Sequence, residues 1–118
     1  MKTKVYEIIF ASVTSLAFAG VVEAADLGRA RQLTGNAMQE AQLAMQGQRG
    51  TLRIAENYLR QVPIFLNDLP RTPAVNQIDF YLNDAIRAVN SNLSLYDQAR
   101  TVLNDGGEVV RMIDVLAR

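Results

Sequence analysis

A proline-containing segment, residues 63–73, divides this sequence into two stretches that share one pattern of apolar spacing. On each side, mostly apolar residues recur at alternating intervals of three and four, which brings them to one narrow face of an α-helix. Before the segment, these seam positions are Met38, Ala41, Met45, Gln48, Leu52, Ala55, Leu59 and Val62. After it, they are Val75, Ile78, Leu82, Ala85, Val89, Asn92, Tyr96, Ala99 and Leu103. The pattern predicts two helices whose apolar seams face one another.

The expected fold class is all-α, because no window alternates apolar and polar residues with the period of two that a half-buried strand requires. We expect helices over residues 36–62 and 74–104, folded into a long antiparallel helical hairpin of the coiled-coil type. Thr72 is the expected N-cap of the second helix, with Pro73 at its first position. Residues 25–118 are expected to form a single domain, since a chain of 118 residues has room for one core.

Glycines near the C-terminus predict a short third helix. Gly106 and Gly107 are expected to end the second helix, since glycine readily adopts the left-handed conformation that a helix terminus needs. A third helix over residues 108–117 follows, with an apolar face that docks on the second helix. Near the other end of the domain, Thr34-Gly35-Asn36 either interrupts the first stretch or caps the long helix.

The two polar seam positions, Gln48 and Asn92, leave two alternatives open. Folding the seams back on one another places both amides within one layer, where a hydrogen bond between them would fix the alignment of the helices. Buried without partners, each amide would cost about 1–3 kcal/mol. The alternative is that Gln48, flanked by Gly47 and Gly50, marks a break in the first helix and is exposed.

The N-terminus has the pattern of an export signal. Lys2 and Lys4 precede an uncharged run over residues 8–22, and small residues suit signal-peptidase cleavage after Ala24. A membrane-spanning helix needs about 20 apolar residues, so we expect a cleaved signal peptide over residues 1–24 and a periplasmic or secreted protein. One alternative is an uncleaved anchor helix, with the uncharged run in contact with the membrane. Another is a buried helix of a cytoplasmic protein.

The composition argues against an enzyme. The chain has no His and no Cys, and both of its lysines lie within the first four residues. Imidazole bases, thiolate nucleophiles and Schiff-base amines are therefore missing from residues 25–118. Two pairs of acids remain, Asp79 with Asp84 and Asp105 with Glu108, and we expect these to be solvated surface groups. We expect no catalytic residue.

Cofactors, metals and nucleic acid are not expected as ligands either. Haem attachment and thiolate metal sites need the cysteines and histidines that this chain lacks. The run of residues 104–108 lacks the alternating oxygen ligands of a calcium loop. Acidic and basic residues balance to a net charge of zero, so there is no basic field for nucleic acid. The expected partner is another protein or a second copy of the chain.

The connector between the two seams is more apolar than a surface loop usually is. Two interpretations are open: an exposed interaction tip that binds a partner, or a plug that folds over the end of the hairpin. The apolar residues concerned are Ile64, Phe65, Leu66 and Leu69.

Two functions follow as expectations. The first is a small, non-catalytic binding or interaction protein of the cell envelope, exported and acting through protein–protein contacts. The alternative is a membrane-anchored structural subunit that self-assembles in an envelope or secretion complex. Over Thr51 to Arg118, the helix, Pro70-Arg71-Thr72-Pro73 turn, helix layout resembles the hairpin of type III secretion needle subunits, which implies self-assembly. The N-terminal leader departs from that family, whose members travel unfolded through their own apparatus.

Overall fold

The computed structural model describes residues 19–118, with side chains described from Leu27 onward. Within this range the chain forms four α-helices, one 3-10 helix and no strand, which confirms the all-α class. The elements are α2 (Ala19–Met45), α3 (Thr51–Gln61), η1 (Val62–Leu66), α4 (Pro73–Val89) and α5 (Leu95–Leu116). Most of the expected leader, including the larger part of its uncharged run, lies outside the described residues.

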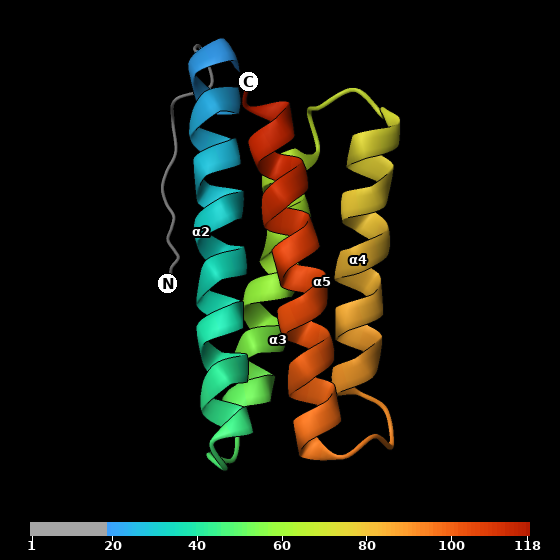
Figure 1. Ribbon diagram of the computed structural model, residues 1–118. Helices are drawn as coiled ribbons and strands as arrows, with labels where there is room; N and C mark the ends of the chain where they lie inside the picture. The colour runs from blue at the N-terminus through green and yellow to red at the C-terminus, as the bar shows by residue number, and fades with distance from the viewer. Residues whose placement is uncertain (1–18) are drawn as a thin grey trace.

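Consecutive α-helices run in opposite directions and lie side by side in a bundle (Figure 1). The helix α2 packs against both α3 and α5, whereas α4 packs mainly on α5. The start of α2, the start of α4 and the end of α5 lie at one end of the bundle (Figure 1). The α2–α3 and α4–α5 loops lie at the opposite end. No helix within residues 19–118 combines the length and apolar character needed to cross a membrane.

The core consists mainly of the aliphatic residues that the 3–4 spacing identifies. Among the seam positions, the buried ones are Ala41, Leu52, Ala55, Leu59, Val62, Val75, Ile78, Leu82, Ala85 and Ala99. The start of α2 and the end of α5 add Ala30, Leu33, Val109 and Ile113. Full burial of one such Leu, Ile or Val side chain contributes about 1.5–3 kcal/mol. The spacing therefore predicts correctly which side of each helix faces the core.

The expected helix over residues 36–62 is wrong, because the chain turns between α2 and α3 at residues 46–50. Gly47 and Gly50 have φ angles of 96° and 86°, a left-handed conformation that residues with a side chain rarely adopt. Gln48 is exposed in this turn. The structure thus agrees with the alternative in which Gln48 marks a break.

The expected helix over residues 74–104 is also wrong, because residues 90–94 form a loop between α4 and α5. Ser94 is the N-cap of α5, and its side-chain oxygen accepts a hydrogen bond of 3.1 Å from the backbone N–H of Asp97. Asn92 is exposed in the loop, so it is not a buried seam amide. Tyr96, expected on the seam, is 51% exposed in the first turn of α5.

The third helix expected over residues 108–117 is not separate, because α5 continues through Gly106 and Gly107 to Leu116. Gly106 is buried at the contact between α5 and α2. A Cβ atom at this position would lie 2.6 Å from Cγ of Met38 and 3.0 Å from its Sδ. The absence of a side chain at Gly106 therefore leaves room for the side chain of Met38 between the two helices.

The structure decides both of the helix starts considered in the sequence. Thr34-Gly35-Asn36 neither interrupts nor caps a helix, because α2 runs through it. Thr34 is fully buried there, and its hydroxyl donates a hydrogen bond of 2.8 Å to the backbone oxygen of Ala30. Thr72 is confirmed as the N-cap of α4, and its side chain accepts a hydrogen bond of 3.3 Å from the N–H of Val75. Pro73 is the first residue of α4. The N–H at this position has no acceptor within the helix, so the missing N–H of proline costs no hydrogen bond.

The two neighbouring glycines provide a matched test of the contact between α2 and α5. Gly106→Ala should destabilise the protein by about 1–3 kcal/mol, because the added methyl group overpacks the contact with Met38. Gly107→Ala should stabilise it by about 0.5–1 kcal/mol, because alanine is the better helix former and no described atom outside its own helix lies within 4 Å of the new Cβ. Urea unfolding measures both changes.

Truncating Met38 is the control for this clash. In a Met38→Ala background, Gly106→Ala should lose its destabilising effect, because the Cγ and Sδ atoms that the new methyl group would overlap are absent. Equal effects of the two alanine substitutions in the wild-type background would contradict the close approach.

Candidate functional site

The α4–α5 loop, residues 90–94, is held by hydrogen bonds from both of its helices. The hydroxyl of Ser91 donates to the backbone oxygen of Ala88 at 2.6 Å and accepts from the N–H of Leu93 at 3.2 Å. From the first turn of α5, the side-chain Nε2 of Gln98 donates to the backbone oxygens of Ser91 at 3.2 Å and Leu93 at 2.8 Å. These bonds fix the backbone of a loop that would otherwise be free to rearrange.

Three large apolar side chains are exposed on this loop and the helix start that follows it. Leu93, Leu95 and Tyr96, which we call the 93–96 patch, are 47%, 38% and 51% exposed. Burial of apolar surface stabilises a protein or a complex by about 25 cal/mol per Å², and exposed side chains lack this stabilisation. Such residues grouped on a well-ordered loop are typical of surfaces that bind a partner.

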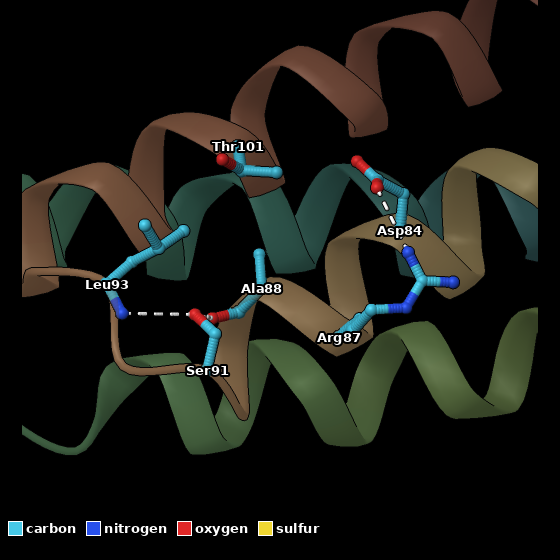
Figure 2. A pocket seen from close by; sticks show the side chains of 6 residues that line it. All are labelled: Asp84, Arg87, Ala88, Ser91, Leu93 and Thr101. Atoms are coloured by element: carbon cyan, nitrogen blue, oxygen red, sulfur yellow. Dashed lines mark hydrogen bonds and ion pairs between the residues drawn. The ribbon is translucent and has the colours of Figure 1, made fainter.

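A shallow open cavity of about 280 Å³ lies beside the 93–96 patch. Figure 2 shows Leu93 at one end of it and the Asp84–Arg87 ion pair at the other. The guanidinium of Arg87 donates to the carboxylate of Asp84 over 3.4 Å. The residues that line the cavity are Asp84, Arg87, Ala88, Ser91, Leu93 and Thr101.

The hydroxyl groups in the cavity wall take part in backbone contacts. Ser91 donates to the backbone oxygen of Ala88, and Thr101 donates to that of Asp97 at 2.9 Å. Both hydroxyl protons are thus directed to carbonyl oxygens instead of to a general base. An apolar wall at Leu93 with an ion pair at the far end suits the binding of an amphipathic group.

A buried carboxylate supports the loop from the neighbouring helix. Glu56 of α3 is 6% exposed, and its Oε2 accepts hydrogen bonds from Arg60 at 2.5 and 2.8 Å and from the Asn90 side chain at 3.1 Å. Burial by itself would raise the pKa of Glu56. The hydrogen bonds from Arg60 and Asn90, with the charges of Arg60 and Arg53, outweigh burial and hold this pKa below its ordinary value.

The four residues of the expected interaction tip do not share one surface. Leu66 is buried, and Phe65 and Leu69 are half-buried against the core. Ile64 is 61% exposed. The positions of the first three match the alternative of a plug, at the end of the bundle where α4 begins (Figure 1).

The four acids noted in the sequence differ in their surroundings. Three of them form ion pairs with arginines, and these pairs are Arg71–Asp79, Arg87–Asp84 and Arg111–Glu108. The expectation of a solvated group is wrong for Asp105, which is 8% exposed. Burial, then hydrogen bonding with Asp84, and then the charges of Asp84 and Glu108 raise the pKa of Asp105 to about 7. Asp84 of α4 is therefore among the acids that act on the buried Asp105 of α5.

Sequence reasoning missed the 93–96 patch because it continued the second helix through the loop. The signal that could have located the loop is Ser94-Leu95-Tyr96-Asp97, a serine followed three residues later by an acid. This spacing is typical of a helix N-terminus, and Ser94 does cap α5. An N-cap at Ser94 would have ended the preceding helix and removed Tyr96 from the seam.

Comparisons of the chain with protein-family models, with curated proteins and with solved structures found no match. Among residues 19–118, no group of three or more acidic side chains is arranged to hold a metal ion. The candidate site therefore rests on the 93–96 patch, its cavity and the residues that support them.

Replacing Glu56 tests its support of the loop. Glu56→Gln keeps the size of the side chain but removes the charge that Arg60 and Asn90 bind, so the free energy of unfolding at pH 7 should fall by about 1–3 kcal/mol. Because the pKa of Glu56 is lowered in the folded state, its contribution is present at neutral pH and lost as the pH falls below its ordinary value.

Urea unfolding at pH 7 and pH 3 measures both effects, with Glu40→Gln in α2 as the matched control. A loss of stability that is the same size at pH 3 as at pH 7 would contradict a role for the charge of Glu56.

Proposed function

We propose that the protein is a small, exported, non-catalytic interaction protein of the cell envelope, and that it binds another protein through the 93–96 patch. The observation that carries the proposal is the exposure of Leu93, Leu95 and Tyr96 on a loop whose backbone Ser91 and Gln98 hold in place. Apolar side chains on an ordered loop lose little conformational entropy when a partner covers them.

The residues that line the cavity support a proposal for the chemistry of the partner. Leu93 belongs to both the patch and the cavity wall, so an apolar side chain of the partner that enters the cavity would contact Leu93 and Ala88. The Asp84–Arg87 ion pair at the far end presents one acidic and one basic group to the polar rim of the interface. We propose an apolar anchor residue, flanked by polar groups, as the part of the partner that binds here.

The location of the patch supports this function for either fate of the leader. The 93–96 patch lies at the end of the bundle opposite the start of α2, and residues 19–24 of α2 belong to the expected leader (Figure 1). Removal of the leader leaves this end unchanged, and an anchor would emerge from the other end. Self-association of an anchored subunit is the alternative function, and a second copy would then occupy the patch.

Site-specific photo-crosslinking in the producing cell tests the patch. A benzophenone amino acid at position 93 or 96 should give an adduct of one discrete mass, because a bound partner covers these positions. The same group at Gln77, an exposed residue of α4, is the control and should give no such adduct. Mass spectrometry identifies the crosslinked chain.

The identified partner is then purified for binding measurements. Leu93→Ser with Tyr96→Ser should weaken its binding at least tenfold, the loss expected when anchor residues are removed. An adduct of twice the chain mass assigns the patch to self-association. Equal labelling from Gln77, or unchanged binding by the double variant, would exclude the patch as the binding surface.

Intact mass in separated cell fractions tests export. The expected result is a chain that lacks residues 1–24 in the soluble envelope fraction, because the sequence predicts signal-peptidase cleavage after Ala24. A full-length chain in the membrane fraction would establish the anchored alternative. A full-length chain in the cytoplasm would refute export.

A further inference from the structure

Asp105 is a buried acid that has no part in the proposed role of the 93–96 patch. It lies inside α5 with 8% of its surface exposed, and its Oδ2 atom is enclosed without a hydrogen-bond partner among the described residues. Burial of an ionised carboxylate without a partner is strongly unfavourable. A proton or a bound cation on the group would remove this cost.

The charged groups nearest to Asp105 are themselves acids. Asp84 of α4 and Glu108 of α5 both act on it, and both disfavour its ionised form. The two neighbouring arginines are already engaged, Arg87 with Asp84 at 3.4 Å and Arg111 with Glu108 at 2.6 Å.

No basic group of α2, the other helix that packs against α5, is among the causes of the raised pKa of Asp105. Next to Asp105, Gly106 faces Thr34 and Met38 of α2, neither of which titrates. The surroundings therefore offer Asp105 one carboxylate as a hydrogen-bond acceptor, that of Asp84.

We propose that Asp84 and Asp105 share one proton across the contact between α4 and α5, and that this proton makes the attachment of α4 depend on pH. The protonated carboxyl of Asp105 donates to the carboxylate of Asp84, a short bond strengthened by the charge of the acceptor. Asp84 keeps its contact with Arg87 on the outer side. The proposal stands whether or not the 93–96 patch binds a partner.

A proton fits the pair better than a metal cation does. Hard cations such as Ca²⁺ take six to eight oxygen ligands, as a rule, and a pair of carboxylates supplies at most four. Within residues 19–118 no third acidic ligand is placed to complete such a site. A cation on Asp84 would also lie beside the guanidinium of Arg87.

The direction of the pH effect follows from the raised pKa of Asp105, about 7 against an ordinary 3.8. The folded state binds this proton more tightly than the unfolded state does, so stability increases as the pH falls through about 7 and the gain is complete below the ordinary value. Above pH 7 the ionised pair repels across the contact between α4 and α5. Glu56 and Asp114, whose pKa values are lowered, act in the opposite direction in stronger acid.

NMR titration of the side-chain carboxyl carbons tests the shared proton in the protein as purified from the producing cell. Asp105 should titrate near pH 7. Asp84→Asn should lower that midpoint, because it removes the charge that helps to hold the proton. A midpoint below about pH 5 for Asp105 in the wild type would overturn the proposal.

Amide hydrogen exchange tests the attachment of α4. After correction for the intrinsic exchange rates, protection of α4 should rise about tenfold between pH 8 and pH 6, the change expected for one proton bound with a midpoint near 7. Protection of the α2 amides should change less. An equal change in both helices would show a general effect on stability and would refute a local effect on α4.

Asp105→Asn is the decisive variant, because its amide donates to Asp84 without a titratable proton. Its melting temperature at pH 8 should exceed that of the wild type by about 4–8 °C, and its dependence on pH between 6 and 8 should disappear. Persistence of that dependence would overturn the proposal. Millimolar Ca²⁺ or Mg²⁺ that stabilises the wild type at pH 8, but not Asp105→Asn, would assign the pair to a metal cation instead.

Discussion

The contact between α2 and α5 is the constraint on which the rest of the bundle depends. Gly106 permits it, because a side chain there would overlap Met38. The contact requires α5 to continue as one helix past both glycines, and it leaves α4 to pack along the other side of α5.

The sequence predicted which residues face the core better than it predicted where helices end. Apolar spacing depends on the helical period alone, so Leu59, Ile78 and Leu82 were placed correctly. A glycine has no such fixed meaning. Gly47 adopts a positive φ and ends a helix, whereas Gly106 sits inside one and admits a neighbour. The difference lies in the tertiary contact, which a local pattern does not contain.

The site was harder to predict for the same reason. A helix continued through residues 90–94 placed Tyr96 on the core side, and a helix end at Gly106 placed Asp105 in solvent. Correcting the two boundaries reverses both assignments, so the exposed aromatic ring and the buried acid are consequences of one continuous α5 that begins at Leu95. The sequence did identify the acids, but the effect of Asp84 on Asp105 depends on the contact between α4 and α5.

The length of α2 has a geometric consequence. Its 27 residues, at a rise of about 1.5 Å each, span about 40 Å, and the 93–96 patch lies near the far end of that distance. On a chain still attached to a bilayer, with the bundle upright, α2 would hold the patch beyond the reach of lipid headgroups. In that arrangement, shortening α2 by a turn would bring the patch about 5 Å closer to the bilayer.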